Sequence, residues 1–328
     1  MQRLWKKRYG NRGGGDKFYI DCSRYAENPN SFEIQSLIRH TSNTYVTILE
    51  AVAKDKTIQD KHRNNIVVKI GPSDDITKKE YQIGEYLKNL NGFIKYICLF
   101  HCFDDTSNKL KNTKTRKNHS EENPVLPKEI KICDAVKKQE NIKDVLVMPY
   151  IKEGSIEKYN WTTENIDILK NTMIHIVLSM AMAFNNMGFI HRDLHLGNVL
   201  LTKTVVEELE YILDKEKNII IREPTMGYKI VIMDFEKAEL NINDIYFFWD
   251  DLYRVLKDID GKDNNNNEKV YWKEEHNILS FIKDKRENRE PLHNILELID
   301  HIKNSSIVMK DKKPPLTYNP NNNFVFLK

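Results

Sequence analysis

Residues 191–201 read His191-Arg-Asp-Leu-His-Leu-Gly-Asn-Val-Leu-Leu, and the prediction of the fold starts from this stretch. It places a carboxylate, Asp193, five residues before an amide, Asn198. A carboxylate can accept a proton and an amide oxygen can bind Mg²⁺, so the pair suits chemistry at a metal-bound phosphate. An amphipathic helical pattern precedes it over 163–188 and an apolar run follows it. The polar residues are therefore predicted to lie in a loop between a helix and a strand.

Two further segments carry charged groups at strand ends or inside strands. Val231-Ile-Met-Asp234-Phe-Glu236 places an acid directly after an apolar run. Ile66-Val-Val-Lys69-Ile places a lysine inside a β-branched run, and Glu80 follows on a predicted helix over 76–90. Taken alone, each would be an ordinary turn carboxylate or surface lysine. In this chain order they supply the cation and the metal ligands that phosphoryl transfer requires.

Together these motifs resemble those of the protein-kinase-like superfamily over roughly residues 32–260. The resemblance implies that Asp193 orients the acceptor hydroxyl and takes its proton. It implies that Asn198 and Asp234 bind Mg²⁺. It further implies that Lys69, held in place by Glu80, contacts the phosphates of ATP. ATP and Mg²⁺ are therefore the expected cofactors.

The nucleotide-binding part of the resemblance is less complete. Val147-Met-Pro-Tyr-Ile is similar to the segment that joins the kinase lobes and binds adenine, which assigns Met148 and Tyr150 to the nucleotide site. The family's glycine-rich lid aligns with a stretch that has no glycine. Its small polar residues Ser42, Asn43 and Thr44 are the candidates for hydrogen bonds to the phosphates.

Other departures point to a different branch of the superfamily. His195 stands where serine/threonine kinases usually have Lys, and Glu236 where they usually have Gly; both resemble aminoglycoside and choline kinases. His195 is either a catalytic contact to the γ-phosphate or a structural residue of the loop. Asp250-Asp251-Leu-Tyr-Arg-Val-Leu resembles the kinase helix whose acid anchors the catalytic loop, which makes Asp251 the first choice for this acid and Asp244 the second. The segment after Asp234 is too short for the usual phosphorylated activation loop.

These observations predict an α+β chain with the two-lobed protein-kinase-like fold, a small β-rich N-lobe and a larger helical C-lobe. An insertion at 203–227 is expected to form an extra helix and strand. The expected parts are a flexible leader (1–31), the N-lobe (32–149) with a polar insertion (about 104–142), the C-lobe (150–310) and a tail (311–328).

Composition narrows the class of partner. The net charge is +3, from 51 basic and 48 acidic residues, and the basic residues are dispersed, so no nucleic-acid partner is expected. No apolar run reaches the ~20 residues of a membrane span, so no membrane partner is expected either. We expect a cytoplasmic monomer acting on a protein substrate or a small hydroxyl acceptor. Asn-rich loops and compact lobes are similar to kinases of large DNA viruses, which would place it in host cytoplasm or virion.

Three functions remain open from sequence. The Arg before Asp193 favours a divergent serine/threonine protein kinase, which is the first choice. The sequence Asp234-Phe-Glu236, together with His195, favours a small-molecule kinase of the aminoglycoside or choline type. The missing lid glycines favour an ATP-binding pseudokinase scaffold, although all the expected charged site residues are present.

Overall fold

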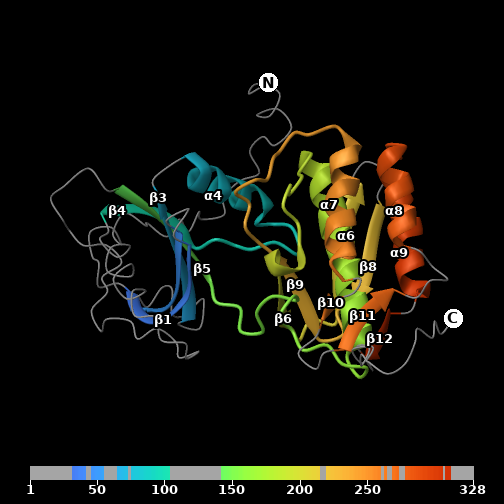
Figure 1. Cartoon of the computed structure of the whole chain (residues 1–328). Coiled ribbons are helices and arrows are strands. Elements are labelled where there is room, and N and C mark those ends of the chain that lie inside the picture. Colours follow the sequence, from blue (N-terminus) through green and yellow to red (C-terminus); the bar gives the residue numbers. More distant parts are fainter. Residues whose placement is uncertain are drawn as a thin grey trace, which may run out of the picture. The chain divides into compact units, whose positions relative to one another are not determined.

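The computed structural model contains helices and antiparallel sheets in an α+β arrangement (Figure 1). The predicted leader, the lid residues Ser42, Asn43 and Thr44, most of the 104–142 insertion and most of the tail lie outside the residues that the structure describes. By their internal contacts the residues fall into two compact units. The described residues are 32–41, 46–54, 65–72, 75–103, 142–214, 219–259, 262–263, 268–272, 278–305 and 307–311.

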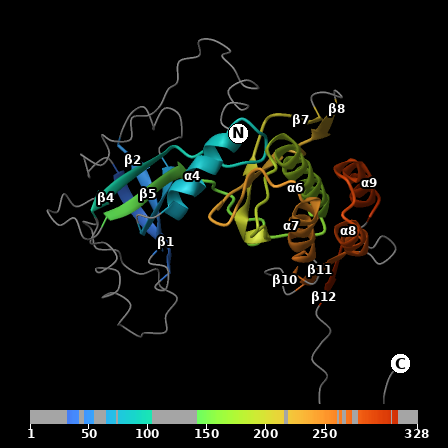
Figure 2. The same ribbon diagram turned by 90° about the horizontal axis from the view of Figure 1, so that it is seen from above.

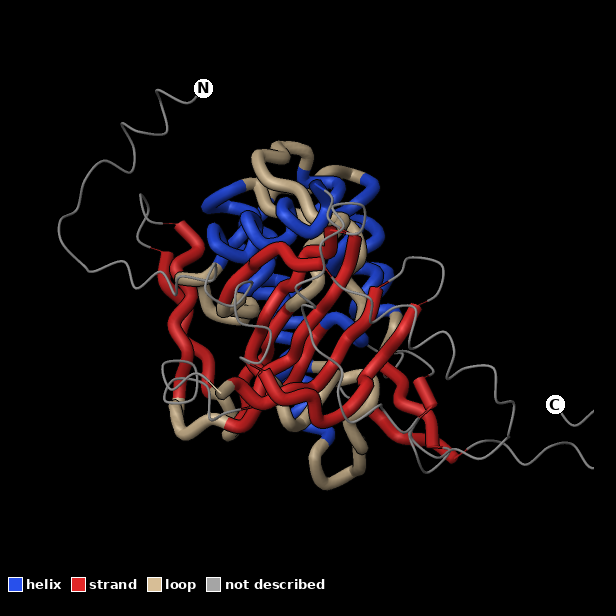
Figure 3. The backbone as a smooth tube through the Cα atoms, turned by 90° about the vertical axis from the view of Figure 1, so that its left-hand side faces the viewer, coloured by secondary structure: helices blue, strands red, loops and turns tan. Residues whose placement is uncertain are grey.

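The first unit, which comprises residues 1–64, 68–73 and 97–147, contains a five-stranded sheet in the order β1-β2-β3-β5-β4. Figure 3 shows the twist of its strands. Side chains of β2 alternate between half-buried and buried, because successive residues of a strand face opposite sides of the sheet. The strands are β1 (Phe32–Thr41), β2 (Val46–Ala53), β3 (Asn65–Pro72), β4 (Cys98–Phe103) and β5 (Ile142–Pro149).

The second unit, which comprises residues 65–67, 74–96 and 148–328, is organised around helix α6 (Ile166–Met187). Helices α7 and α9 and strands β7 and β9 contact α6, and α8 packs against α7 and α9 (Figures 1 and 2). Its helical elements are α4 (Asp75–Leu87), α6, η2 (Leu196–Asn198), α7 (Ile245–Lys257), α8 (Ile278–Glu287), η3 (Leu292–Asn294) and α9 (Ile295–Asn304). Its strands are β6 (Val199–Lys203), β7 (Glu208–Asp214), β8 (Ile219–Pro224), β9 (Tyr228–Ile232), β10 (Lys262–Asp263), β11 (Glu268–Trp272) and β12 (Ile307–Asp311).

Helix α6 is also the one helix among the described residues that is long and apolar enough to cross a membrane. Most of it is buried against the neighbouring elements, which is the position of a core helix. It ends at Gly188, whose backbone is left-handed with φ 60°. A Cβ at this glycine would lie 2.6 Å from backbone atoms of Ile242, so the chain needs glycine here to leave the helix.

The two-stranded ladder β6–β9 positions the polar loops of the second unit. Val199 pairs with Ile232 in antiparallel register, so the residue before β6 and the residue after β9 lie at the same end of the ladder. The N–H of Met233 donates a hydrogen bond to the backbone oxygen of Asn198 at 3.0 Å. This register brings the predicted catalytic loop and the predicted metal-binding segment together.

The insertion after β6 differs from the sequence prediction. The described residues of the insertion, 203–214 and 219–227, contain the two antiparallel strands of the hairpin β7–β8, and none of these residues forms the expected helix. Tyr211 and Leu213 of β7 are buried, while Glu208 and Glu210 are exposed, which is the alternation of a strand with one buried face. The ring nitrogens of His175 on α6 bond the Tyr211 hydroxyl at 2.7 Å and the backbone oxygen of Pro224 at 2.9 Å. The hairpin is therefore fixed to the core helix.

Other boundaries shift by a few residues. The helix expected over 76–90 is α4. The strand expected over 93–103 is β4, which begins only at Cys98; Phe93 forms an isolated bridge to Ile232 and is not part of that strand. The helix expected over 163–188 is α6. The mostly helical region expected over 240–305 also contains the short strands β10 and β11, which pair with each other, and β11 pairs with β12 on its other side.

Candidate active site

A buried carboxylate on α7 holds the backbone of the 191–198 loop. The N–H of His191 donates a hydrogen bond of 2.6 Å to Oδ2 of Asp251, a residue that is 2% exposed. Arg192 also donates a backbone hydrogen bond to this carboxylate. Burial raises the pKa of Asp251 to about 7, although both hydrogen bonds act in the opposite direction. Asp251 is thus the anchor that the sequence predicted, while Asp244 caps α7 by accepting the N–H of Tyr246.

The loop and the metal-binding segment are also joined by side chains. Nδ2 of Asn198 donates to the backbone oxygen of Asp193 at 3.1 Å, which leaves Oδ1 as the atom suited to a metal. Nε2 of His191 bonds the carbonyl oxygen of Met233 at 3.0 Å, and that carbonyl can only accept, so Nε2 carries the hydrogen. Burial lowers the pKa of His191, which keeps the ring neutral near pH 7. The structure therefore places Asp193, Asn198 and Asp234 on two adjoining segments.

Two residues of these segments have left-handed backbone. Arg192 has φ 66° and Asp234 has φ 69°. Non-glycine residues adopt this conformation at a cost of about 1–3 kcal/mol, and such residues cluster at functional sites. The neighbours of both are fixed: the backbone of His191 by Asp251, and that of Met233 by Asn198. The surrounding structure thus holds each residue in its strained conformation.

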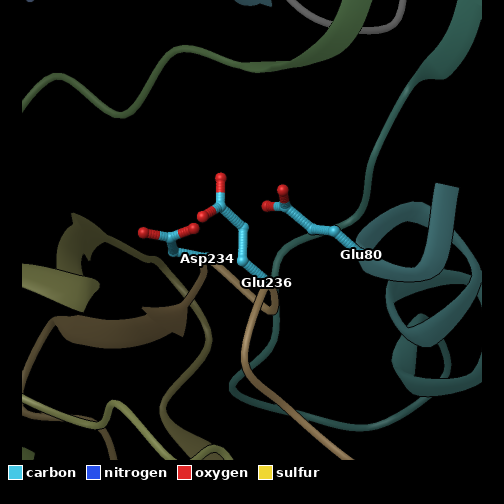
Figure 4. A group of neighbouring side chains, drawn as sticks. All are labelled: Glu80, Asp234 and Glu236. Atoms are coloured by element: carbon cyan, nitrogen blue, oxygen red, sulfur yellow. The ribbon is translucent and has the colours of Figure 1, made fainter. Parts of the chain in front are cut away.

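Three carboxylates converge beside the metal-binding segment. Figure 4 shows Glu80 from α4 facing Asp234 and Glu236, and one oxygen of each lies within 4.8 Å of the others. Like charges at this distance repel each other, and a divalent cation would relieve the repulsion. Carboxylate oxygens, together with Oδ1 of Asn198, are the hard ligands that Mg²⁺ prefers. The residues present therefore fit the expected metal.

A tyrosine that the sequence reasoning did not single out connects this cluster to the core. The Tyr96 hydroxyl donates to Oε1 of Glu80 at 2.7 Å, and the Tyr96 ring packs edge-on against Phe235, with centroids 6.0 Å apart. Burial, followed by the charge of Glu80, raises the pKa of Tyr96 well above its ordinary value. Gly84 makes room for the ring, because a Cβ there would lie 2.3 Å from Cδ2 of Tyr96. Tyr96 thus fixes Glu80 relative to the residue that follows Asp234.

A lysine that the sequence reasoning missed contacts the predicted catalytic carboxylate. Nζ of Lys237 donates to Oδ2 of Asp193 at 2.8 Å. Burial raises the pKa of Asp193, but the hydrogen bond and charge of Lys237 outweigh this, so the pKa lies below its ordinary value. Asp193 is consequently ionised near neutral pH, as a proton acceptor must be.

The side chains of Arg192 and His195, in the same loop as Asp193, bond other groups. Nδ1 of His195 accepts the N–H of Gly197 at 3.1 Å, which caps the short helix η2. Nε of Arg192 donates to Glu239 at 3.1 Å, and its guanidinium lies 3.6 Å from the centroid of the Phe247 ring. A structural role of His195 in the loop is therefore visible, and its catalytic contact to phosphate stays a prediction.

The remaining predicted residues belong to the strands and the segment that joins the two units. Lys69 is buried in β3 of the first unit, with 8% of its surface exposed. The chain passes from the first unit to the second between Val147 and Met148. Met148 is buried at the end of β5, and the N–H of Tyr150 donates to the backbone oxygen of Asn65 at 3.3 Å. Their contacts to a nucleotide stay predictions.

Comparisons with known proteins point to serine/threonine kinases. The chain is 32% identical over 127 residues to serine/threonine-protein kinase haspin of Bos taurus, which covers 34% of this chain and 15% of that protein. It is 35% identical over 95 residues to haspin of Mus musculus, covering 29% and 12% respectively. It is 30% identical over 108 residues to the haspin homolog of Arabidopsis thaliana, covering 33% and 18%. No family model matches the chain. The matched part spans less than a fifth of each relative, and these partial matches support a kinase-like family.

Proposed function

We propose that this chain is an ATP- and Mg²⁺-dependent protein kinase of the serine/threonine type with a two-lobed kinase fold. One observation supports the proposal: the register of β6 and β9 sets the segment that carries Asp193 and Asn198 beside the segment that carries Asp234. The partial matches to serine/threonine kinases support the same reaction class.

In the proposed reaction, each of the predicted site residues has its own role. Bound Mg-ATP would supply the γ-phosphoryl group and the cation that offsets its charge. Asp193 holds the acceptor hydroxyl in line and receives its proton. Asn198 and Asp234 bind the metal, and Glu80 and Glu236 lie where they can complete its coordination. Lys69 is proposed to contact the α- and β-phosphates.

A small hydroxyl compound is the second candidate acceptor. The observation that favours it is Glu236, which turns the metal-binding segment into Asp-Phe-Glu and adds a third carboxylate to the cluster. Aminoglycosides and choline represent this class. Parallel assays with protein acceptors and with these compounds separate the two candidates.

The metal assignment is tested by Asp234→Asn. This change removes a charged ligand but little volume, so the melting temperature should change by only a few degrees. Transfer of γ-phosphate should fall by about 100-fold or more, because loss of an electrostatic contact to the transferring phosphoryl group costs that much. Wild-type turnover by Asp234→Asn at limiting Mg²⁺ would rule out the assignment.

A further inference from the structure

Lys237 has a contact that neither the sequence motifs nor the comparisons assign. It follows the metal-binding segment, three residues after Asp234, and its side chain is 64% exposed. Its Nζ lies 2.8 Å from Oδ2 of Asp193, whose own side chain is 36% exposed. The lysine therefore reaches across from one segment of the site to the carboxylate of the other.

The catalytic loop itself does not supply this contact. At position 195 the loop carries a histidine, and Nδ1 of that ring is used to cap η2. A Cβ on Gly197 would lie 2.8 Å from the His195 ring, so the ring is closely packed in the turn. The side chain of Arg192 is held by Glu239 and Phe247. Among the described residues, the cation that hydrogen-bonds Asp193 thus comes from outside the loop.

A contribution to folding does not explain the contact. An ion pair between two solvent-exposed side chains stabilises a protein little, because water screens the charges and both side chains lose rotamer freedom. The contact can instead set the orientation of the Asp193 carboxylate. A carboxylate that must face an acceptor hydroxyl works only in a narrow range of angles, and misplacement slows the reaction strongly.

We propose that Lys237 is a positioning residue for phosphoryl transfer, which holds Oδ2 of Asp193 so that Oδ1 faces the acceptor. The inference rests on the proposed function. In the step concerned, the acceptor oxygen forms a bond to the γ-phosphorus while the bond from that phosphorus to the β–γ bridging oxygen breaks. ADP leaves with the electron pair, and the acceptor proton passes to Asp193.

The test compares three variants of the full chain with the wild type. Lys237→Met removes both the charge and the donor, and Lys237→Arg keeps both. Lys203→Met removes an exposed lysine in β6, away from the site segments, and is the matched control. Initial rates of ³²P transfer from Mg-ATP to casein give kcat and the KM for ATP, and melting temperatures are recorded for each protein.

Lys237→Met should lower kcat by about 10- to 100-fold, which is the effect of losing one hydrogen bond to a charged group. The KM for ATP should change by less than about threefold and the melting temperature by less than about 2 °C. Lys237→Arg should retain at least about a third of the wild-type kcat, and Lys203→Met all of it. A purely structural role would not produce a kcat effect without a change in melting temperature.

Three results would overturn the inference while leaving the proposed function intact. They are a wild-type kcat for Lys237→Met, a loss confined to the KM for ATP, and a Lys237→Arg enzyme as slow as Lys237→Met. If wild type and Lys203→Met both fail to transfer phosphate to any acceptor class, the proposed function fails and the inference fails with it.

Discussion

Asp251 is the buried acid that fixes the catalytic loop. Replacing it with Ala and with Asn distinguishes the effect of losing its hydrogen bonds from the cost of burying its charge. Asp251→Ala leaves the backbone N–H groups of His191 and Arg192 without their acceptor. An unpaired buried donor costs about 1–3 kcal/mol, so the free energy of unfolding should fall by roughly 2–5 kcal/mol. Asp251→Asn keeps the shape and an acceptor oxygen, so it should lose less than half of that near neutral pH.

The difference between wild type and Asp251→Asn should also depend on pH. Burial raises the pKa of Asp251 from 3.8 to about 7, so the folded protein holds this proton where the unfolded chain releases it. The stabilisation of the folded protein by this bound proton is fully present below pH 3.8 and is lost as pH rises toward 7. At about 1.36 kcal/mol per pH unit, the free energy of unfolding of wild type should fall relative to Asp251→Asn by at most about 4 kcal/mol.

Urea denaturation followed by tryptophan fluorescence, to which Trp249, buried on α7, contributes, measures this difference. We would record wild type, Asp251→Asn and Asp251→Ala at about pH 4.5, 6 and 8, with Asp300→Asn on the exposed side of α9 as control. The gap between wild type and Asp251→Asn should shrink or reverse as pH rises. A gap that widens with pH would refute the reasoning, because hydrogen bonding to the ionised form would then outweigh desolvation.

Two further predictions concern the packing around the site and the hairpin. Gly84→Ala should destabilise the chain by about 1–3 kcal/mol and reduce transfer activity, because its Cβ would overlap the Tyr96 ring. Adding Tyr96→Leu to this variant should restore stability. A double variant that melts at the same temperature as Gly84→Ala would contradict this. His175→Phe should cost about 1–3 kcal/mol, because the buried Tyr211 hydroxyl loses its hydrogen bond to the His175 ring. Adding Tyr211→Phe should recover part of the melting temperature, and a further loss would contradict the account.

The sequence predicted what depends on local patterns. Apolar spacing located α6, and the interval between Asp193 and Asn198 located the loop after it. Asp251 was found because Asp250-Asp251-Leu-Tyr-Arg-Val-Leu resembles the kinase helix whose acid anchors the catalytic loop. The catalytic-loop motif could be located without knowing which distant residues contact it.

Contacts that depend on the path of the backbone were missed. Lys237 is one of many lysines, and only the turn after Asp234 brings it to Asp193. The Tyr96 contact to Glu80 requires the space left by Gly84. In the β7–β8 hairpin, dense charges hid the alternation around Tyr211, so the segment was assigned partly to a helix.

The most direct test of the central claim is transfer of labelled γ-phosphate from Mg-ATP by wild type and by Asp193→Asn. Protein acceptors, aminoglycosides and choline are assayed in parallel. The account predicts label on protein serine or threonine with wild type, and at least about a 100-fold lower rate with Asp193→Asn. Label only on a small molecule would move the acceptor to the second class. Equal transfer by both proteins, or none to any acceptor while Mg-ATP is bound, would contradict the account.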